Sequence, residues 1–183
     1  MMTQPIRTVL WFNGRGREAA EFYCSLIPDS RVTGFYASDN GGPDGNMHFE
    51  VVDFILRGVP YQILDAGPMF PLSECVSIMV ETPDQAETDR LWEALAANGG
   101  SHGPCGWLKD RYGLSWQVVP AEVSRLMLQP DRARAERALA AVMHMGKIDL
   151  AAVQAAAAEG ARMPAIPQEQ RYRPGARLMP GVL

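Results

Sequence analysis

The sequence lacks the features that mark several broad classes of protein. Its three cysteines, Cys24, Cys75 and Cys105, are odd in number and lack the close pairing of a zinc knuckle. We therefore expect reduced thiols that pack as small hydrophobic side chains. No run reaches the ~20 apolar residues that span a bilayer, and residues 1 to 7 lack the apolar stretch of a secretion signal. These absences predict a cytoplasmic protein that has no membrane partner.

Positive charge is also scarce. The chain has 17 Lys and Arg against 21 Asp and Glu, a formal net charge of −4. Proteins that bind a phosphate backbone need a concentration of positive charge, so we expect no nucleic-acid partner. Hydrophobic residues make up 47% of the chain and charged residues 21%, which is typical of folded domains and predicts a packed core.

Residues 1 to 73 show the order of one strand, one helix and three strands. The helix is predicted at 17 to 26, and the strands at 6 to 12, 31 to 36, 47 to 56 and 59 to 64. A tight turn at Arg57-Gly58 joins the last two strands. Residues 37 to 45 are rich in Gly, Asp and Asn, which predicts a mobile loop for which a lid is one role, and residues 66 to 73 form a linker.

Residues 74 to 120 repeat this order. A strand at 75 to 80 is followed by Thr82-Pro83-Asp84-Gln85, which predicts a capping box with Pro83 as the first helical residue. The buried stripe of the second helix should consist of Thr88, Leu91, Trp92 and Leu95. A short strand within 100 to 103 and a hairpin of 105 to 109 with 114 to 119 would complete this module.

The C-terminal third has a different character. Residues 121 to 160 favour helices and form an appended extension, whereas residues 161 to 183 are rich in proline and arginine and cannot build a core. We expect this tail to lie along the partner subunit of a homodimer. An alternative is an interaction module, in which the helices and tail act as a dimerisation clasp.

Several stretches of the sequence together resemble a known family. They are Leu10-Trp11-Phe12, residues 18 to 23, residues 28 to 32, residues 84 to 92 and, most specifically, residues 105 to 117. They resemble the PhnB-like family of the glyoxalase/bleomycin-resistance (vicinal oxygen chelate) superfamily, which often carries the label 3-demethylubiquinone methyltransferase. The resemblance extends from about residue 6 to residue 120. It implies an α+β fold of two tandem βαβββ modules whose mixed sheets form a cup, often completed across a dimer, with a small-molecule ligand inside.

The resemblance also bears on metal binding. Metal-using relatives hold the ion with a His early in the first strand and a Glu on the last strand of each module. Carried over to this chain, the first-strand positions are Thr8 and Ser77, and the last-strand positions are Gln62 and Gln117. Neutral hydroxyls and amides are poor substitutes for imidazole and carboxylate, so we expect no metal ion. The chain also shows no Gly-rich loop of the kind that nucleotide-like cofactors use, and we expect no cofactor.

The period of two in a strand predicts which side chains face the cup. If Thr8 faces inward, Leu10 and Phe12 do so too, and Ser77 faces inward with Cys75 and Met79. Counting through the two hairpin turns places Asp53 opposite Gln62, and Gly106 opposite Gln117. The predicted ligand-binding residues are therefore Thr8, Asp53, Gln62, Ser77 and Gln117.

These residues favour a metal-independent protein that binds a small molecule, since a few polar groups among apolar walls are typical of ligand pockets. An enzyme of unknown reaction, using Asp53 as an acid or base or Cys75 as a nucleophile, stays open, including the transferase that the family label names. A metalloenzyme of the glyoxalase or dioxygenase type is a further alternative. The sequence does not identify the ligand.

Overall fold

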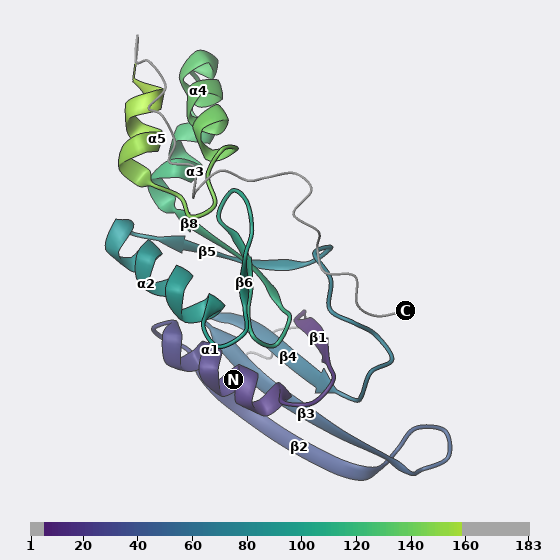
Figure 1. Cartoon of the computed structure of the whole chain (residues 1–183). Helices are drawn as coiled ribbons and strands as arrows, with labels where there is room; N and C mark the ends of the chain where they lie inside the picture. Colours follow the sequence, from purple (N-terminus) through teal and green to yellow (C-terminus); the bar gives the residue numbers. More distant parts are fainter. Residues whose placement is uncertain (1–5, 159–183) are drawn as a thin grey trace. The chain divides into compact units, whose positions relative to one another are not determined.

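A computed structural model describes residues 6–158 of the chain, which contacts divide into a first unit up to Glu74 and a second unit from Cys75 on. Each unit contains a four-stranded mixed sheet (Figure 1). The first unit consists of β1 (Thr8–Phe12), α1 (Gly16–Leu26), β2 (Arg31–Gly41), β3 (Met47–Leu56) and β4 (Val59–Asp65). The second unit consists of β5 (Ser77–Thr82), α2 (Gln85–Ala96), β6 (Ser101–His102), β7 (Trp107–Lys109), β8 (Ser115–Pro120), α3 (Ala121–Leu128), α4 (Arg132–Val142) and α5 (Leu150–Ala157). This α+β order confirms the two βαβββ repeats.

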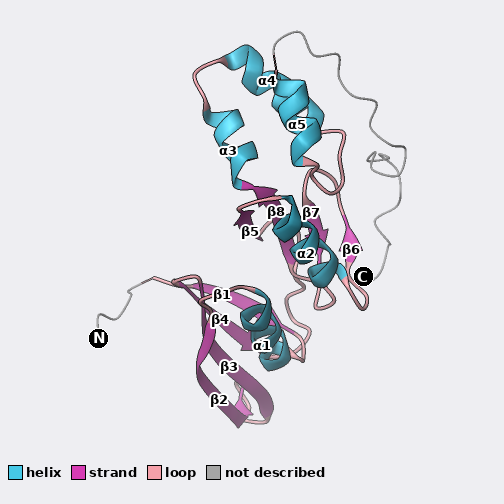
Figure 2. Cartoon of the chain, turned by 90° about the vertical axis from the view of Figure 1, so that its left-hand side faces the viewer, coloured by secondary structure: helices cyan, strands magenta, loops and turns pink. Residues whose placement is uncertain are grey.

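The first sheet has the strand order β1-β4-β3-β2, with β1 parallel to β4 and the other neighbours antiparallel. Helix α1 lies on one face of this sheet (Figure 2). Its buried residues include Ala19, Ala20 and Tyr23, and the Tyr23 ring lies 6.4 Å from that of Phe54 in β3. The small alanines bring the helix close to the sheet, so the core of this unit lies between α1 and β3 and β4.

Strand β2 is longer than predicted. Residues 37 to 41, expected to belong to a mobile loop, continue the strand, and Ala37, Ser38 and Gly41 pair with β3. The prediction of a loop is therefore wrong for residues 37 to 41. The pairing satisfies the backbone groups of a segment whose composition alone favours turns, because ladder hydrogen bonds outweigh weak local propensity. Only residues 42 to 46 connect β2 to β3.

The second sheet has the equivalent order, β5-β8-β7-β6. The buried stripe of α2 is confirmed as Thr88, Leu91, Trp92 and Leu95. The predicted cap is wrong in detail. Asp84 is the N-cap, and its side chain accepts a hydrogen bond from the backbone N–H of Glu87 at 2.8 Å, so Pro83 precedes the helix. Strand β5 begins at Ser77, two residues later than predicted.

Helices α3, α4 and α5 pack together beside the second sheet (Figure 2). They share a hydrophobic cluster that includes Val123, Ala141, Met145 and Val153. The side chain of Gln85 joins this cluster to α2, since it donates to the Ile148 carbonyl and accepts from the Leu150 N–H. The predicted tail, residues 161 to 183, and its contact with a partner lie outside the described residues. Within 6–158 no helix is long and apolar enough to cross a membrane.

Candidate functional site

Asp53 and Gln62 lie together on the first sheet, as predicted. They are direct partners in the pairing of β3 with β4, and Gln62 Nε2 donates a hydrogen bond to Asp53 Oδ1 at 2.8 Å. Arg7 Nη1 donates to the same oxygen, also at 2.8 Å. The Asp53 side chain is 35% exposed, so this cluster is accessible to solvent. Sequence reasoning missed Arg7, which precedes β1.

Thr8 does not join this cluster. The register of β1 with β4 pairs Thr8 with Tyr61, whose ring stacks on that of Phe54 at 5.4 Å, and Phe54 packs against Tyr23 of α1. Residues that pair directly across a sheet share a face. Thr8 therefore lies on the face that carries α1, and its predicted place beside Gln62 is wrong.

The same correction applies to the rest of β1. Leu10 and Phe12 are buried, and they lie on the sheet face that α1 covers. Leu10 pairs with Ile63, and Ile63 contacts the start of α1 so closely that a Cβ on Gly16 would lie only 2.6 Å from its side chain. We name the face of the first sheet opposite α1 its outer face. The direct partner of Gln62 there is Val9. The period of two predicts which side chains of one strand share a face. Only the pairing with the neighbouring strand decides which of the two alternating sets of side chains faces the helix.

Ser77 and Gln117 are brought together in the second unit. Gln117 Nε2 donates to Ser77 Oγ at 2.8 Å. Both lie on the face opposite α2, the outer face of the second sheet, because the intervening residues Ile78 and Val80 are buried beneath the helix. Met79 pairs with Gln117 in the ladder, which confirms the predicted facing of Ser77 and Met79.

The residue opposite Gln117 differs from the prediction. Trp107 of β7 takes this position, not Gly106. Cys105 and Gly106 both have positive φ angles, 56° and 82°, so they form a turn and the strand begins at Trp107, two residues later than predicted. The partner of Gln117 is consequently a large aromatic side chain, and the open space expected there is absent from this outer face.

The cysteines offer little nucleophilic chemistry. Burial raises the pKa of the Cys24 and Cys105 thiols, which lowers the fraction of reactive thiolate. Cys75 is exposed and lies before β5, so it is not part of the strand on which its predicted facing depended.

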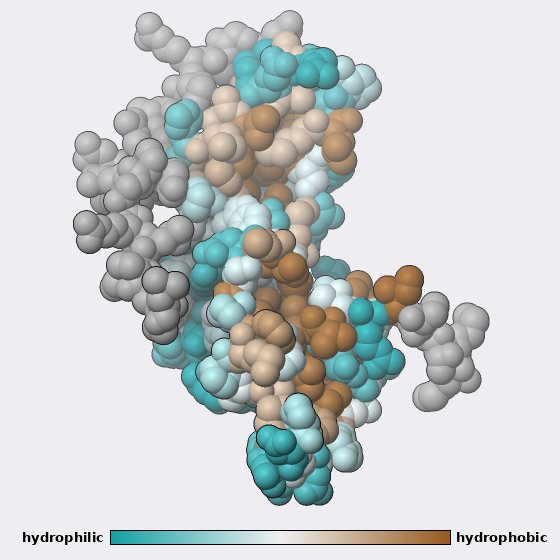
Figure 3. Space-filling view, turned by 90° about the vertical axis from the view of Figure 1, so that its right-hand side faces the viewer, coloured by the Kyte–Doolittle hydropathy of each residue, from teal (hydrophilic) through white to brown (hydrophobic). Residues whose placement is uncertain are grey.

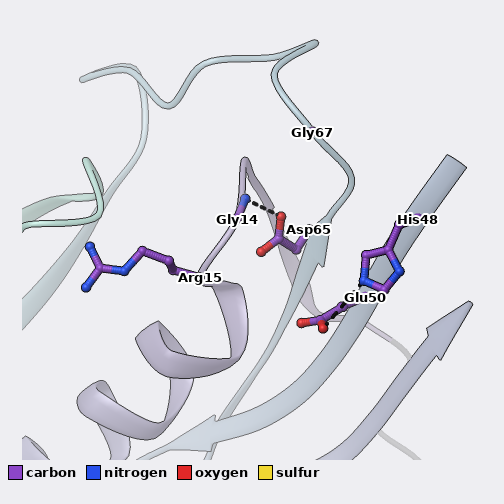
Figure 4. A pocket seen from close by; sticks show the side chains of 6 residues that line it. All are labelled: Gly14, Arg15, His48, Glu50, Asp65 and Gly67. Atoms are coloured by element: carbon purple, nitrogen blue, oxygen red, sulfur yellow. Dashed lines mark hydrogen bonds and ion pairs between the residues drawn. The ribbon is translucent and has the colours of Figure 1, made fainter. Parts of the chain in front are cut away.

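A cleft of about 290 Å³ lies on the other side of the first sheet, at the beginning of α1 (Figure 4). It is lined by Gly14, Arg15, His48, Glu50, Asp65 and Gly67. The carboxylate of Asp65 accepts hydrogen bonds from the backbone N–H groups of Gly14, at 2.5 Å, and Gly16, at 2.7 Å. The loop before α1 therefore does bind an anionic group, as helix N-termini do, but that group is an internal carboxylate.

His48 lies at the edge of this cleft. Its Nδ1 is 2.6 Å from Asp39 Oδ1, and its Nε2 is 3.7 Å from Glu50 Oε1. The hydrogen bond with Asp39, together with the charges of both carboxylates, raises the pKa of His48. Because the folded state favours the charged imidazole, the His48–Asp39 pair contributes stability below the ordinary pKa near 6.5, and this contribution is lost as the pH rises through the folded-state pKa.

We expect an NMR titration of the imidazole to give a pKa for His48 above its ordinary value, and the substitution Asp39→Asn to lower it. Asp44→Asn provides a matched control, because Asp44 is an exposed carboxylate between the same two strands. An equal decrease in both variants would mean that general charge, and not the contact with Asp39, sets the pKa.

The donor set does not fit a divalent metal ion. Within residues 6–158, no three His, Cys, Asp or Glu side chains are placed to hold one. The outer face around Gln62 offers a single carboxylate, Asp53, and the Arg7 guanidinium already binds it. A cation there would have to displace a positive group and gain few anionic ligands, which disfavours binding.

A family model described as 3-demethylubiquinone-9 3-methyltransferase matches residues 4–119. The PhnB protein from Bacillus cereus is 28% identical, with a TM-score of 0.54 over 64% of this chain and 99% of its own. A fosfomycin resistance protein, FosX from Listeria monocytogenes, is 11% identical, with a TM-score of 0.50 over 70% of this chain and 99% of its own, a likeness of fold alone. No curated protein matches the chain.

Proposed function

Since the chain belongs to the 3-demethylubiquinone-9 3-methyltransferase (PhnB-like) family of the vicinal oxygen chelate superfamily, we propose that it is a metal-independent protein that binds a small molecule. One observation carries the proposal. Gln62 and Gln117 occupy the same place in the two repeats, each in the strand parallel to the first strand of its module and each bonded to a polar neighbour on an outer face. Amides can both donate and accept, so they suit a polar but uncharged contact with a ligand.

The environment of Asp53 supports binding more than catalysis. A general acid or base gains its unusual reactivity from burial or from an unbalanced charge. Asp53 instead accepts two hydrogen bonds on one oxygen, from Arg7 and from Gln62, and it is partly exposed. The alternative of an enzyme that uses Asp53 is therefore weaker.

The transferase alternative has little support from the described residues. A nucleotide-like cofactor would use the N–H groups of a Gly-rich loop between a strand and a helix. Gly14 does lie in the loop from β1 to α1 and Gly16 is the first residue of α1, but their N–H groups are bonded to Asp65. A cofactor phosphate or carboxylate would have to replace this internal anion.

We also propose that the protein works in the cytoplasm as a homodimer. Neighbours in the vicinal oxygen chelate superfamily often form dimers, and no disulfide joins Cys24, Cys75 or Cys105. Sedimentation of the full chain tests the assembly, and a monomer at all concentrations would contradict it.

A fragment screen by NMR in the presence of EDTA tests the main proposal. We expect fragments that bind to shift resonances on an outer face without added metal. Gln62→Ala should weaken binding to the outer face of the first sheet by about tenfold, and Gln117→Ala should weaken binding to the outer face of the second sheet to the same extent, because each removes a hydrogen bond to a fragment on its own sheet. Gln154→Ala, on the exposed side of α5, is the control and should have no effect. Binding that requires zinc, nickel or manganese would indicate a metalloprotein instead.

A further inference from the structure

The outer face of the first sheet is arranged in rows. Strand register places Gly34, Asp53, Gln62 and Val9 in one row. The next row, which we call the aromatic row, consists of Tyr36, Val51, Leu64 and Trp11. Val9 and Tyr36 are 52% and 58% exposed, and Figure 3 shows hydrophobic side chains at the surface of this unit. The outer face thus combines two polar side chains with an accessible hydrophobic surface.

Arg7 adds positive charge at the edge of these rows. Its side chain is 43% exposed, and among the described residues it bonds only to Asp53, through Nη1. A guanidinium has five N–H donors in a rigid fork that matches a carboxylate. Most of its donors are therefore accessible to a second anion.

The spacing of the rows suits a flat molecule. Gly34 lacks a side chain, so nothing projects from β2 beside Asp53, and a Cβ there would lie 3.5 Å from the Asp53 side chain. Side chains in successive rows of one face are two residues apart along the strand, or about 7 Å. This distance is about the length of an aromatic ring that carries an acid group.

We propose that the outer face of the first sheet binds an aromatic carboxylate, with the acid paired to Arg7 and the ring against the aromatic row. The inference rests on the proposed function and names the class of ligand. Asp53 accepts a hydrogen bond from the Arg7 guanidinium and therefore competes with the ligand for it.

The experiment uses the full chain and two probes of nearly equal shape, 2-naphthoate and the neutral 2-naphthamide. We expect 2-naphthoate to bind about tenfold more tightly, because a charge-assisted bond to arginine is stronger than a neutral one. The backbone resonances of Val9, Gln62 and Leu64 and the indole N–H of Trp11 should shift.

Three variants identify the anchor. Arg7→Gln should remove the preference for the acid, whereas Arg17→Gln, which removes the same charge from a side chain paired with Glu21 on α1, should preserve it. Asp53→Asn should strengthen binding of 2-naphthoate several-fold, because the competing carboxylate is gone. Weaker binding by Asp53→Asn would overturn the role of Arg7 as anchor.

The inference and the proposed function fail in different ways. Equal affinity for the two probes, shifts elsewhere in the chain, or binding of neither probe would overturn the aromatic carboxylate site. The proposed function would survive each of these results if other fragments shift resonances of an outer face through Gln62 or Gln117. If no fragment in the screen does so, both fail.

Discussion

Replacing Asp110 with alanine is expected to lower the free energy of unfolding of the second unit by about 4 kcal/mol. Asp110 is 3% exposed and organises the turn between β7 and β8. Its Oδ1 accepts hydrogen bonds from the N–H groups of Tyr112, at 2.8 Å, and Leu114, at 3.0 Å. Its Oδ2 accepts from Trp116 Nε1 at 2.8 Å. The substitution leaves three donors without their acceptor.

The magnitude follows from burial. Leu114 and Trp116 are 1% and 0% exposed, so water cannot replace the lost acceptor without opening the hairpin. A buried donor without a partner costs roughly 1–3 kcal/mol, and bonds to a charged acceptor lie at the upper end. Asp131→Ala is the matched control, because Asp131 is an exposed N-cap with one bond, to the Arg134 N–H, and its loss should cost about 1 kcal/mol.

Urea denaturation followed by tryptophan fluorescence measures this effect. Trp92, Trp107 and Trp116 report on the second unit, whereas Trp11 reports on the first. Trp116→Phe removes one of the three donors and should recover part of the stability when it is combined with Asp110→Ala. A loss no larger than that of Asp131→Ala would show that the Asp110 bonds are replaced in the variant.

Local patterns were sufficient to predict features that depend on neighbouring residues. The place of Asp53 opposite Gln62 follows from the two-residue turn at Arg57 and Gly58, whose φ angles of 45° and 86° match the turn that favours a tight hairpin. Such a turn fixes the register of both strands. For the same reason the buried stripe of α2 could be read from helical spacing alone.

Features that depend on distant residues could not be predicted in this way. The face of Thr8 is decided by the pairing of β1 with β4, about fifty residues later, and no local pattern encodes that register. Arg7 joins the site only through this pairing. The position of Gly106 was wrong for a different reason, because the positive φ of Cys105 is unusual for a residue with a side chain.

The two polar pairs differ in charge even though the two repeats share a strand order. Gln62 has a charged partner, Asp53, which is in turn paired with Arg7, whereas Gln117 has the neutral hydroxyl of Ser77. An anionic ligand is therefore attracted by the first sheet more than by the second. This asymmetry is why the carboxylate site is proposed on the first sheet alone.

Asp65→Ala is expected to destabilise the first unit by about 3 kcal/mol. Asp65 is 8% exposed, and its two oxygens bind the N–H groups of Gly14 and Gly16, which α1 leaves without partners. Gly14 and Arg15 have φ angles of 80° and 66°, and the side chain of Arg15 does not cap the helix. The carboxylate thus holds the beginning of α1 against the end of β4. Without it, the segment with positive φ angles before α1 loses both of its hydrogen bonds to Asp65.

The fluorescence of Trp11 and hydrogen exchange of the α1 amides measure this loss, which should be greatest in the first turn of the helix. Asp84→Ala is the matched control, because Asp84 caps α2 from an exposed position with one bond and should cost about 1 kcal/mol. Asp65→Asn should fall between the two, since an amide retains one accepting oxygen. If Asp65→Ala costs no more than Asp84→Ala, water has replaced the carboxylate, and the cleft beside α1 is open enough to hydrate the helix N-terminus.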